Sequence, residues 1–116
     1  MEIYEKNCYM FILNLAKELA QDYDIQYQHM EEFARWNLPE ELALEWIDAE
    51  GMVILLEARK CISKETAEEL HKIIRAFLLE FEKIENPVWT HEAMKVSDFW
   101  NTQRSNARKV LGKMEV

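Results

Sequence analysis

Residues 37–56 read NLPEELALEWIDAEGMVILL, and this stretch decides the fold class. Asn37, Leu38 and Pro39 interrupt the preceding pattern, and proline is favoured in the first turn of a helix, where its missing N–H is not needed. Apolar residues then recur at the spacing of one buried helix face, namely Leu42, Ala43, Trp46 and Ile47. The stretch therefore predicts a helix that begins near Pro39.

The end of this stretch, MVILL at residues 52–56, fits two kinds of structure. A continuous apolar run suits a buried strand or part of a helix, and periodicity does not separate the two. As a helix, it continues the preceding one through Gly51, at a cost of about 1 kcal/mol relative to Ala. This continuation places Val53, Ile54 and Leu56 on the buried side. We predict helix, because no second candidate strand is present to pair with it.

Helical periodicity also marks the N-terminal part of the chain. A first helix over residues 3–21 has one apolar face, made by Tyr4, Cys8, Phe11, Ile12, Leu15, Ala16 and Leu19. A second helix is capped by Asp24 and turns Tyr27, Met30, Phe33 and Ala34 inward.

The C-terminal half predicts two more helices with clear boundaries. Ser63 is the N-cap of a helix over about 64–85 that buries Ala67, Leu70, Ile74, Phe77, Leu78 and Phe81, and Asn86-Pro87 ends it. Thr90 caps a brief turn over residues 91–94. Ser97 then opens a last helix with one inward side, made by Phe99, Trp100, Gln103, Ala107, Val110 and Leu111. We predict an all-α fold, a compact antiparallel helical bundle of about five helices in a single domain over residues 1–116.

Composition narrows the possible settings of this bundle. Hydrophobic residues make up 49% of the 116 residues, and only two Gly and two Pro occur, which disfavours turn-rich β folds. The sequence shows no apolar run long enough to span a membrane and no signal peptide at its start. Cys8 and Cys61 form no CxxC pair, so we expect free, buried thiols in a reducing cytoplasm.

The net charge of −8 is concentrated in one part of the chain. Residues 22–50 contain nine acidic residues and one base, Arg35, a balance equal to the whole net charge. Phosphate backbones and anionic membranes both attract Lys and Arg, so this distribution argues against nucleic-acid and membrane partners. A dense negative field instead favours a basic protein partner and speeds its association.

The acidic residues of the 37–51 segment form a candidate binding face. Glu41, Glu45 and Asp48 stand at helical spacing opposite the apolar side, where like charges cost about 0.2–0.5 kcal/mol per pair. Glu45, Asp48 and Glu50 also lie too far along the expected helix to gain from its dipole. A face that costs stability favours a functional role over a merely solvated surface. The predicted partner-binding residues are Glu41, Glu45 and Asp48, flanked by Glu31, Glu32 and Trp36.

Catalytic and metal sites find little support. Two isolated glycines cannot build a phosphate-binding loop, and no serine lies in a nucleophile motif. Glu68 and His71 form an ExxH pair on one helix face, but carboxylate di-metal bundles use two such pairs and further glutamates. We therefore predict no enzyme, no cofactor and no metal, and keep a metal-binding protein or enzyme using Glu68 and His71 as an alternative.

The four tryptophans divide into two groups. Trp46 and Trp100 fall on predicted buried faces, and core packing explains them. Trp36 and Trp89 fall near predicted helix ends, where each is either a half-exposed interface anchor or a lid over the end of the bundle.

Four segments together resemble the layout of bacterial immunity proteins that neutralise contact-dependent or polymorphic toxins. They are LPEELALEWIDAE (38–50), the helix after CISKET (61–66), VWTHEAM (88–94) and DFWNTQRSNARKVL (98–111). This resemblance implies a cytoplasmic inhibitor that binds a cognate toxin domain. The acidic face further suggests that the toxin is basic, as a nuclease would be. A self-associating helical adaptor is another alternative, and an apolar patch left outside the bundle core would support it.

Overall fold

The computed structural model describes residues 1–33, 38–85 and 87–114, with the backbone alone at residues 30–33 and 87. Within these ranges the chain forms seven α-helices and one short 3-10 helix, and no β-strand. They are α1 (Ile3–Ala20), α2 (Tyr23–Phe33), α3 (Leu38–Asp48), α4 (Glu50–Ala58), α5 (Lys64–Phe81), η1 (Pro87–Trp89), α6 (His91–Val96) and α7 (Asp98–Met114). The predicted all-α fold is confirmed.

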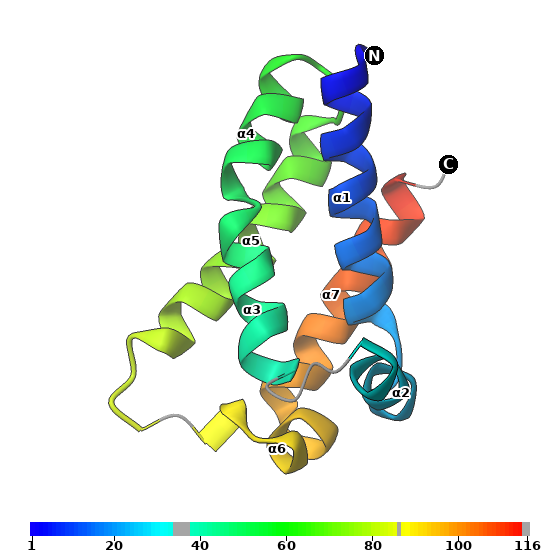
Figure 1. Cartoon of the computed structure of the whole chain (residues 1–116). Helices are drawn as coiled ribbons and strands as arrows, with labels where there is room; N and C mark the ends of the chain where they lie inside the picture. The colour runs from blue at the N-terminus through cyan, green and yellow to red at the C-terminus, as the bar shows by residue number, and fades with distance from the viewer. Residues whose placement is uncertain (34–37, 86, 115–116) are drawn as a thin grey trace.

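The long helices lie side by side in alternating directions (Figure 1). α1 and α5 run one way, whereas α7 and the successive helices α3 and α4 run the other way. α1 packs most extensively on α7, and α5 contacts α3, α4 and α7. α2 and α6 close one end of this antiparallel bundle. The described helices outnumber the predicted five because the third is divided in two and the turn at residues 91–94 is the helix α6.

The division between α3 and α4 corrects the prediction of one helix through Gly51. α3 ends at Asp48 and α4 begins at Glu50, with Ala49 between them. Helix-like hydrogen bonds still bridge the break, because Ala49 N donates to Glu45 O (3.1 Å) and Val53 N donates to Ala49 O (3.1 Å). The two helices therefore follow nearly one line in Figure 1.

The MVILL run is helical, as predicted, but one of its predicted core positions is wrong. Val53 and Leu56 are fully buried, whereas Ile54 is 54% exposed. Five consecutive helical residues, at about 100° each, point in every direction around the axis. At least one side chain of such a run must face solvent when the core covers a single side of the helix.

Aromatic packing resolves the role of three tryptophans. Trp46 and Trp100 are fully buried, as predicted, and Trp100 Nε1 donates to Val88 O at 2.7 Å. Trp89 is half-buried, and its ring stacks on Phe81 with centroids 4.3 Å apart. Trp89 is therefore a lid over the core rather than an exposed anchor.

Local capping signals explain where the C-terminal helices begin. Ser63 Oγ accepts the N–H of Thr66 (3.0 Å), and Thr90 Oγ1 accepts the N–H of Ala93 (3.0 Å). Ser97 Oγ likewise accepts a first-turn N–H of α7 at 3.3 Å. These three predicted caps are confirmed, because a capping bond joins residues only three positions apart and needs no distant partner.

Other predicted details are wrong. Asp24 is not the N-cap of α2 but lies in its first turn, after Tyr23. α5 ends at Phe81 instead of near residue 85, and Asn86 lies outside the described residues. Cys8 is buried and Cys61 only half-buried, although both are free thiols as expected. The inward positions Met30, Phe33 and Ala34 fall where side chains are not described.

Besides Ile54, four predicted core side chains lie at the surface: Tyr4 is 63% exposed, Phe11 is 40%, Tyr27 is 39% and Leu78 is 37%. On α1 the buried face is rotated relative to the predicted apolar face, because Glu5 and Leu13 are buried in place of Tyr4 and Phe11. Periodicity indicates which residues can face a core, but the neighbouring helices decide how much of that face they cover.

Candidate functional site

The six predicted partner-binding residues fall into three groups in the structure. The side chains of Glu31 and Glu32, on α2, and the whole of Trp36 lie outside the described residues. Glu41 and Glu45 on α3 are half-buried, and each already has an interaction partner. Asp48 is exposed at the end of α3. The predicted stripe is therefore not the centre of the exposed face of α3.

The centre of that face is formed by Glu40, Leu44 and Asp48, a set that we call the α3 outer face. These residues are four positions apart, so they stack along one side of the helix. All three are exposed, and Leu44 is 48% accessible although it is a large apolar residue. The sequence contained a signal for this set, because Leu44 lies two positions from the buried Trp46 and so points to the opposite side of the helix.

Three of the carboxylates in this region are favoured by helix dipoles. Glu40 and Glu41 lie in the first turn of α3, and Glu50 lies in the first turn of α4, next to the positive end of each dipole. The expectation that Glu50 gains nothing from a dipole is therefore wrong, because the break at Ala49 creates a new helix start. Asp48 sits where the end of α3 meets the start of α4, so the two opposite dipole ends offset each other there.

The exposed carboxylates of this region are not compensated by neighbouring bases in the part of the chain that the structure describes. Among the described residues, no ion pair involves Glu40, Asp48 or Glu50, and all three are exposed. Some acidic residues elsewhere do meet bases, as in the pairs Glu65–Lys113 (2.8 Å), Glu80–Lys83 (2.6 Å) and Asp22–Arg108 (3.1 Å), whereas other exposed acidic residues, such as Glu82 and Glu92, are in no described ion pair. The α3 outer face and Glu50 thus combine uncompensated negative charge with one exposed apolar side chain.

The ExxH pair of the metal-binding alternative lies in a shallow hollow on α5. Glu68 and His71 share this hollow of about 530 Å³ with Lys72 and Arg75. Within the described parts of the chain, no three metal-ligating side chains come together. Two neighbouring cations also repel a metal ion, so the geometry does not favour this alternative.

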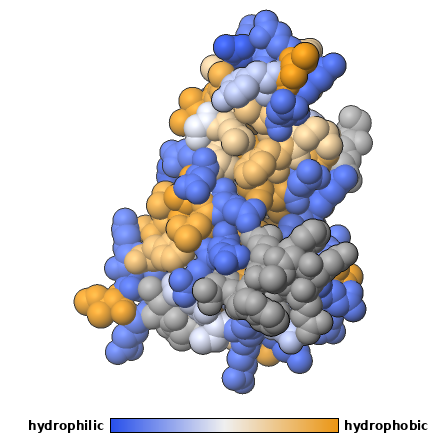
Figure 2. Space-filling model, in the orientation of Figure 1, coloured by the Kyte–Doolittle hydropathy of each residue, from blue (hydrophilic) through white to orange (hydrophobic). Residues whose placement is uncertain are grey.

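A second exposed feature is apolar and lies on a different side of α1 from its core contacts. Large apolar side chains of α1 and α4 are exposed, namely Ile3 (78%), Tyr4 (63%), Met10 (48%), Phe11 (40%) and Ile54 (54%). α1 and α4 pack against each other, and Figure 2 shows apolar surface over this side of the bundle, broken by hydrophilic residues. Exposed apolar surface of this kind marks a candidate interaction site.

Among the helices that the structure describes, none is both long and apolar enough to cross a lipid bilayer. In comparisons with known proteins, the chain matches no protein-family model, and neither a curated protein nor a solved structure is significantly similar to it.

Proposed function

We propose that this protein is an immunity protein, an inhibitor that neutralises a toxin. It binds a basic toxin domain of nuclease type through the α3 outer face. The observation that carries the proposal is the exposed Leu44 between the uncompensated carboxylates of Glu40 and Asp48. An apolar centre with a polar rim is the usual composition of a protein–protein interface.

The mechanism is occlusion of the partner's cationic surface. Carboxylates of Glu40, Asp48 and Glu50 pair with Lys and Arg side chains that otherwise hold nucleic-acid phosphates. The concentrated charge of residues 22–50 accelerates the encounter, and burial of Leu44 slows release. Glu41 and Glu45 border this surface, and Glu31, Glu32 and Trp36 remain predicted contributors to its flank.

Rate measurements with the isolated partner test this assignment. The partner is co-purified from the native host, and its binding rates are measured at several salt concentrations. We expect Glu40→Gln combined with Asp48→Asn to slow association by roughly tenfold at low salt and to flatten its salt dependence. Leu44→Ser should mainly speed dissociation, because a buried apolar contact affects the bound state more than the encounter.

A matched control variant carries the same kinds of change at exposed positions on α5 and directly after its end, as Glu68→Gln, Leu79→Ser and Glu82→Gln. The α3 variant combines Glu40→Gln, Leu44→Ser and Asp48→Asn. Cells that produce the partner should survive with the control variant and die with the α3 variant. Equal rates for the two variants would refute the α3 outer face as the binding surface. A partner without a cationic surface would refute the occlusion mechanism.

The exposed apolar surface of α1 and α4 favours self-association as a second candidate function. Ile3, Met10 and Ile54 are each about half exposed or more, and pairing of two copies would remove them from water. Sedimentation of the wild-type protein should then show a dimer, and Met10→Glu should shift it to monomer. A monomer at all concentrations would exclude this candidate and leave the inhibitor proposal untouched.

A further inference from the structure

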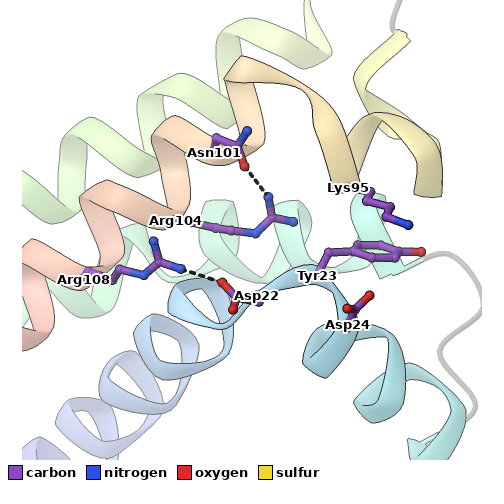
Figure 3. A pocket seen from close by; sticks show the side chains of 7 residues that line it. All are labelled: Asp22, Tyr23, Asp24, Lys95, Asn101, Arg104 and Arg108. Carbon is purple, nitrogen blue, oxygen red and sulfur yellow. Dashed lines mark hydrogen bonds and ion pairs between the residues drawn. The ribbon is translucent and has the colours of Figure 1, made fainter.

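A polar pocket lies at the end of the bundle where α2, α6 and α7 meet. Its volume is about 460 Å³, and its lining side chains are Asp22, Tyr23, Asp24, Lys95, Asn101, Arg104 and Arg108. Figure 3 shows the α7 side chains along one wall, the start of α2 along the opposite wall and Lys95 of α6 at one end. The pocket shares no residue with the α3 outer face or with the apolar surface of α1 and α4.

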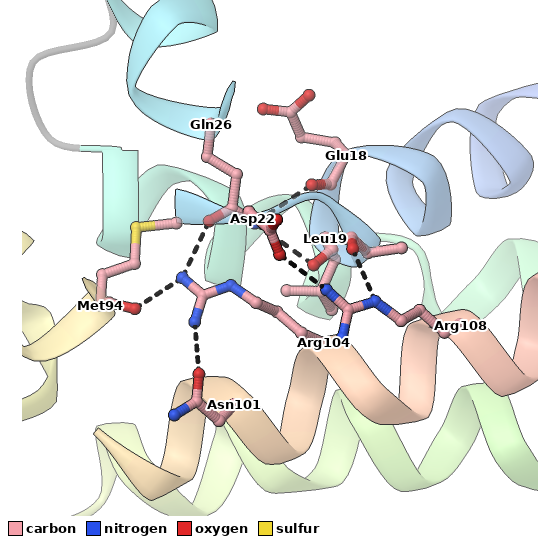
Figure 4. Close-up of polar contacts among 9 residues, drawn as sticks. Glu18, Leu19, Asp22, Gln26, Met94, Asn101, Arg104 and Arg108 are labelled. Atoms are coloured by element: carbon pink, nitrogen blue, oxygen red, sulfur yellow. Dashed lines mark hydrogen bonds and ion pairs between the residues drawn. The ribbon is translucent and has the colours of Figure 1, made fainter. Parts of the chain in front are cut away.

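Arg104 is the central residue of this pocket and has an unusual environment. It is only 4% exposed, and its guanidinium donates to three uncharged acceptors (Figure 4): Gln26 Oε1 at 2.9 Å, the backbone oxygen of Met94 at 2.5 Å and Asn101 Oδ1 at 3.1 Å. Its buried Nε has no hydrogen-bond partner among the described residues. A buried cation is normally offset by a carboxylate in direct contact, and none of these acceptors is one.

The other charged groups of the pocket leave it with a positive balance. Lys95, Arg104 and Arg108 contribute three cations, against the carboxylates of Asp22 and Asp24. Asp22 is engaged by Arg108, whose Nη2 lies 3.1 Å from Asp22 Oδ1. Arg104 and Lys95 therefore face only one further carboxylate, that of Asp24. Burial, and then the neighbouring Arg108, lower the pKa of Arg104, which indicates that its charge is poorly compensated.

The backbone adds to this positive field. α2 begins at Tyr23, and its first two residues, Tyr23 and Asp24, line the pocket. The first N–H groups of a helix have no intrahelical acceptor, and the helix dipole places positive charge at that end. In a chain with a net charge of −8, a hollow that gathers three cations and a helix start is a local exception.

We propose that this pocket binds a small molecule through an anionic oxygen group, a phosphate or a carboxylate. Lys95 Nζ and the Nδ2 amide of Asn101 donate to the anion, because Asn101 Oδ1 is already used by Arg104. The second N–H of Arg104 Nη1 completes the donor set, and the anion supplies the counter-charge that the guanidinium lacks. Ligand binding then connects α6 and α7 beside the start of α2.

Nuclear magnetic resonance titration of the isotope-labelled protein tests the proposal directly. One arm uses inorganic phosphate, another uses acetate, and sodium chloride at matched ionic strength is the reference. We expect saturable shifts of the backbone amides of Tyr23, Asp24 and Asn101 with at least one of the two anions. Tighter binding of phosphate would identify a phosphate-bearing ligand, and tighter binding of acetate would identify a carboxylate.

Two variants connect the shifts to the pocket without touching the buried Arg104. Lys95→Gln should weaken anion binding by about fivefold, which corresponds to roughly 1 kcal/mol. The matched control is Lys109→Gln, which removes an exposed cation from α7 outside the pocket lining and should leave binding unchanged. The proposal would be overturned if the shifts with phosphate and with acetate did not saturate and equalled those with sodium chloride. It would also be overturned if Lys95→Gln and Lys109→Gln weakened anion binding equally.

Discussion

Arg104 joins four helices through a chain of hydrogen bonds. It lies on α7 and binds Gln26 of α2 and the backbone of Met94 in α6. Gln26 is fully buried, and its Nε2 donates to the backbone oxygens of Glu18 (3.1 Å) and Leu19 (3.2 Å) in α1. This network fixes how α2 and α6 close the end of the bundle.

Replacing Arg104 should therefore destabilise the fold. We expect Arg104→Met to lower the free energy of unfolding by roughly 2–4 kcal/mol, because the oxygens of Gln26 and Met94 lose their donor while still buried. Urea denaturation measures the change, with Lys109→Met at an exposed position of α7 as the control. A loss no larger than that of the control would show that the network contributes little to stability.

Glu5 gives the fold an acid-sensitive contact at the start of α1. Its Oε1 accepts the backbone N–H of Glu2 at 2.7 Å in a capping box, and Arg59 lies 3.6 Å from its other oxygen. The hydrogen bond from Glu2, with smaller contributions from Cys61 and Arg59, lowers the pKa of Glu5 below its usual 4.5. The carboxylate is therefore preferred in the folded state.

The sign of the pH dependence follows from this lowered pKa. The stability from Glu5 is present above pH 4.5, the usual pKa, and is lost as the pH falls through the lower pKa of the folded state. Denaturation midpoints measured across the acidic range should fall less steeply for Glu5→Gln than for the wild type. Parallel profiles would show that Glu5 does not contribute to acid sensitivity.

At the scale of elements, the end of α4 carries a residue with an unfavourable backbone conformation. Lys60 has φ of 59°, in the left-handed region. The hydrogen bonds of Lys60 N to Glu57 O (3.0 Å) and of Cys61 N to Leu56 O (2.8 Å) form a Schellman motif, in which this position usually holds glycine.

We expect Lys60→Gly to raise the free energy of unfolding by about 0.5–1 kcal/mol, because glycine adopts a positive φ without a clash of Cβ. Lys60→Ala is the matched control, since it removes the same side chain but keeps Cβ. Thermal or urea denaturation measures both variants. Equal effects of Gly and Ala would attribute the change to the lysine side chain and not to backbone strain.

At the scale of the whole molecule, the uneven charge distribution should make stability depend on salt. Residues 22–50 carry a net charge of −8, and Glu40, Asp48 and Glu50 have no described ion-pair partner. Added sodium chloride screens this repulsion, so the denaturation midpoint should rise with salt. The combined variant Glu40→Gln, Asp48→Asn and Glu50→Gln should show a smaller rise. A midpoint that falls with salt would mean that attractive ion pairs dominate.

The α3 region shows how far sequence reasoning reached toward the candidate site. The acidic segment and its helix were predictable, because charge and periodicity are written directly in residues 37–56. The sequence pattern did not show that Glu41 and Glu45 are half-buried and already have interaction partners. Their burial places the centre of the exposed face of α3 at Leu44 instead. The pocket at Arg104 had no sequence signal, since its lining residues are distributed over positions 22–108.

The sequence by itself determined the all-α class, the caps at Ser63 and Thr90, and the burial of Trp46 and Trp100. These features depend on residues within a few positions of one another, where helical spacing and capping bonds act. Only the tertiary structure decided the break at Ala49, the exposure of Phe11 and the surroundings of Arg104. Each of these depends on which distant helix covers a given side chain, and packing between helices is not encoded in local periodicity.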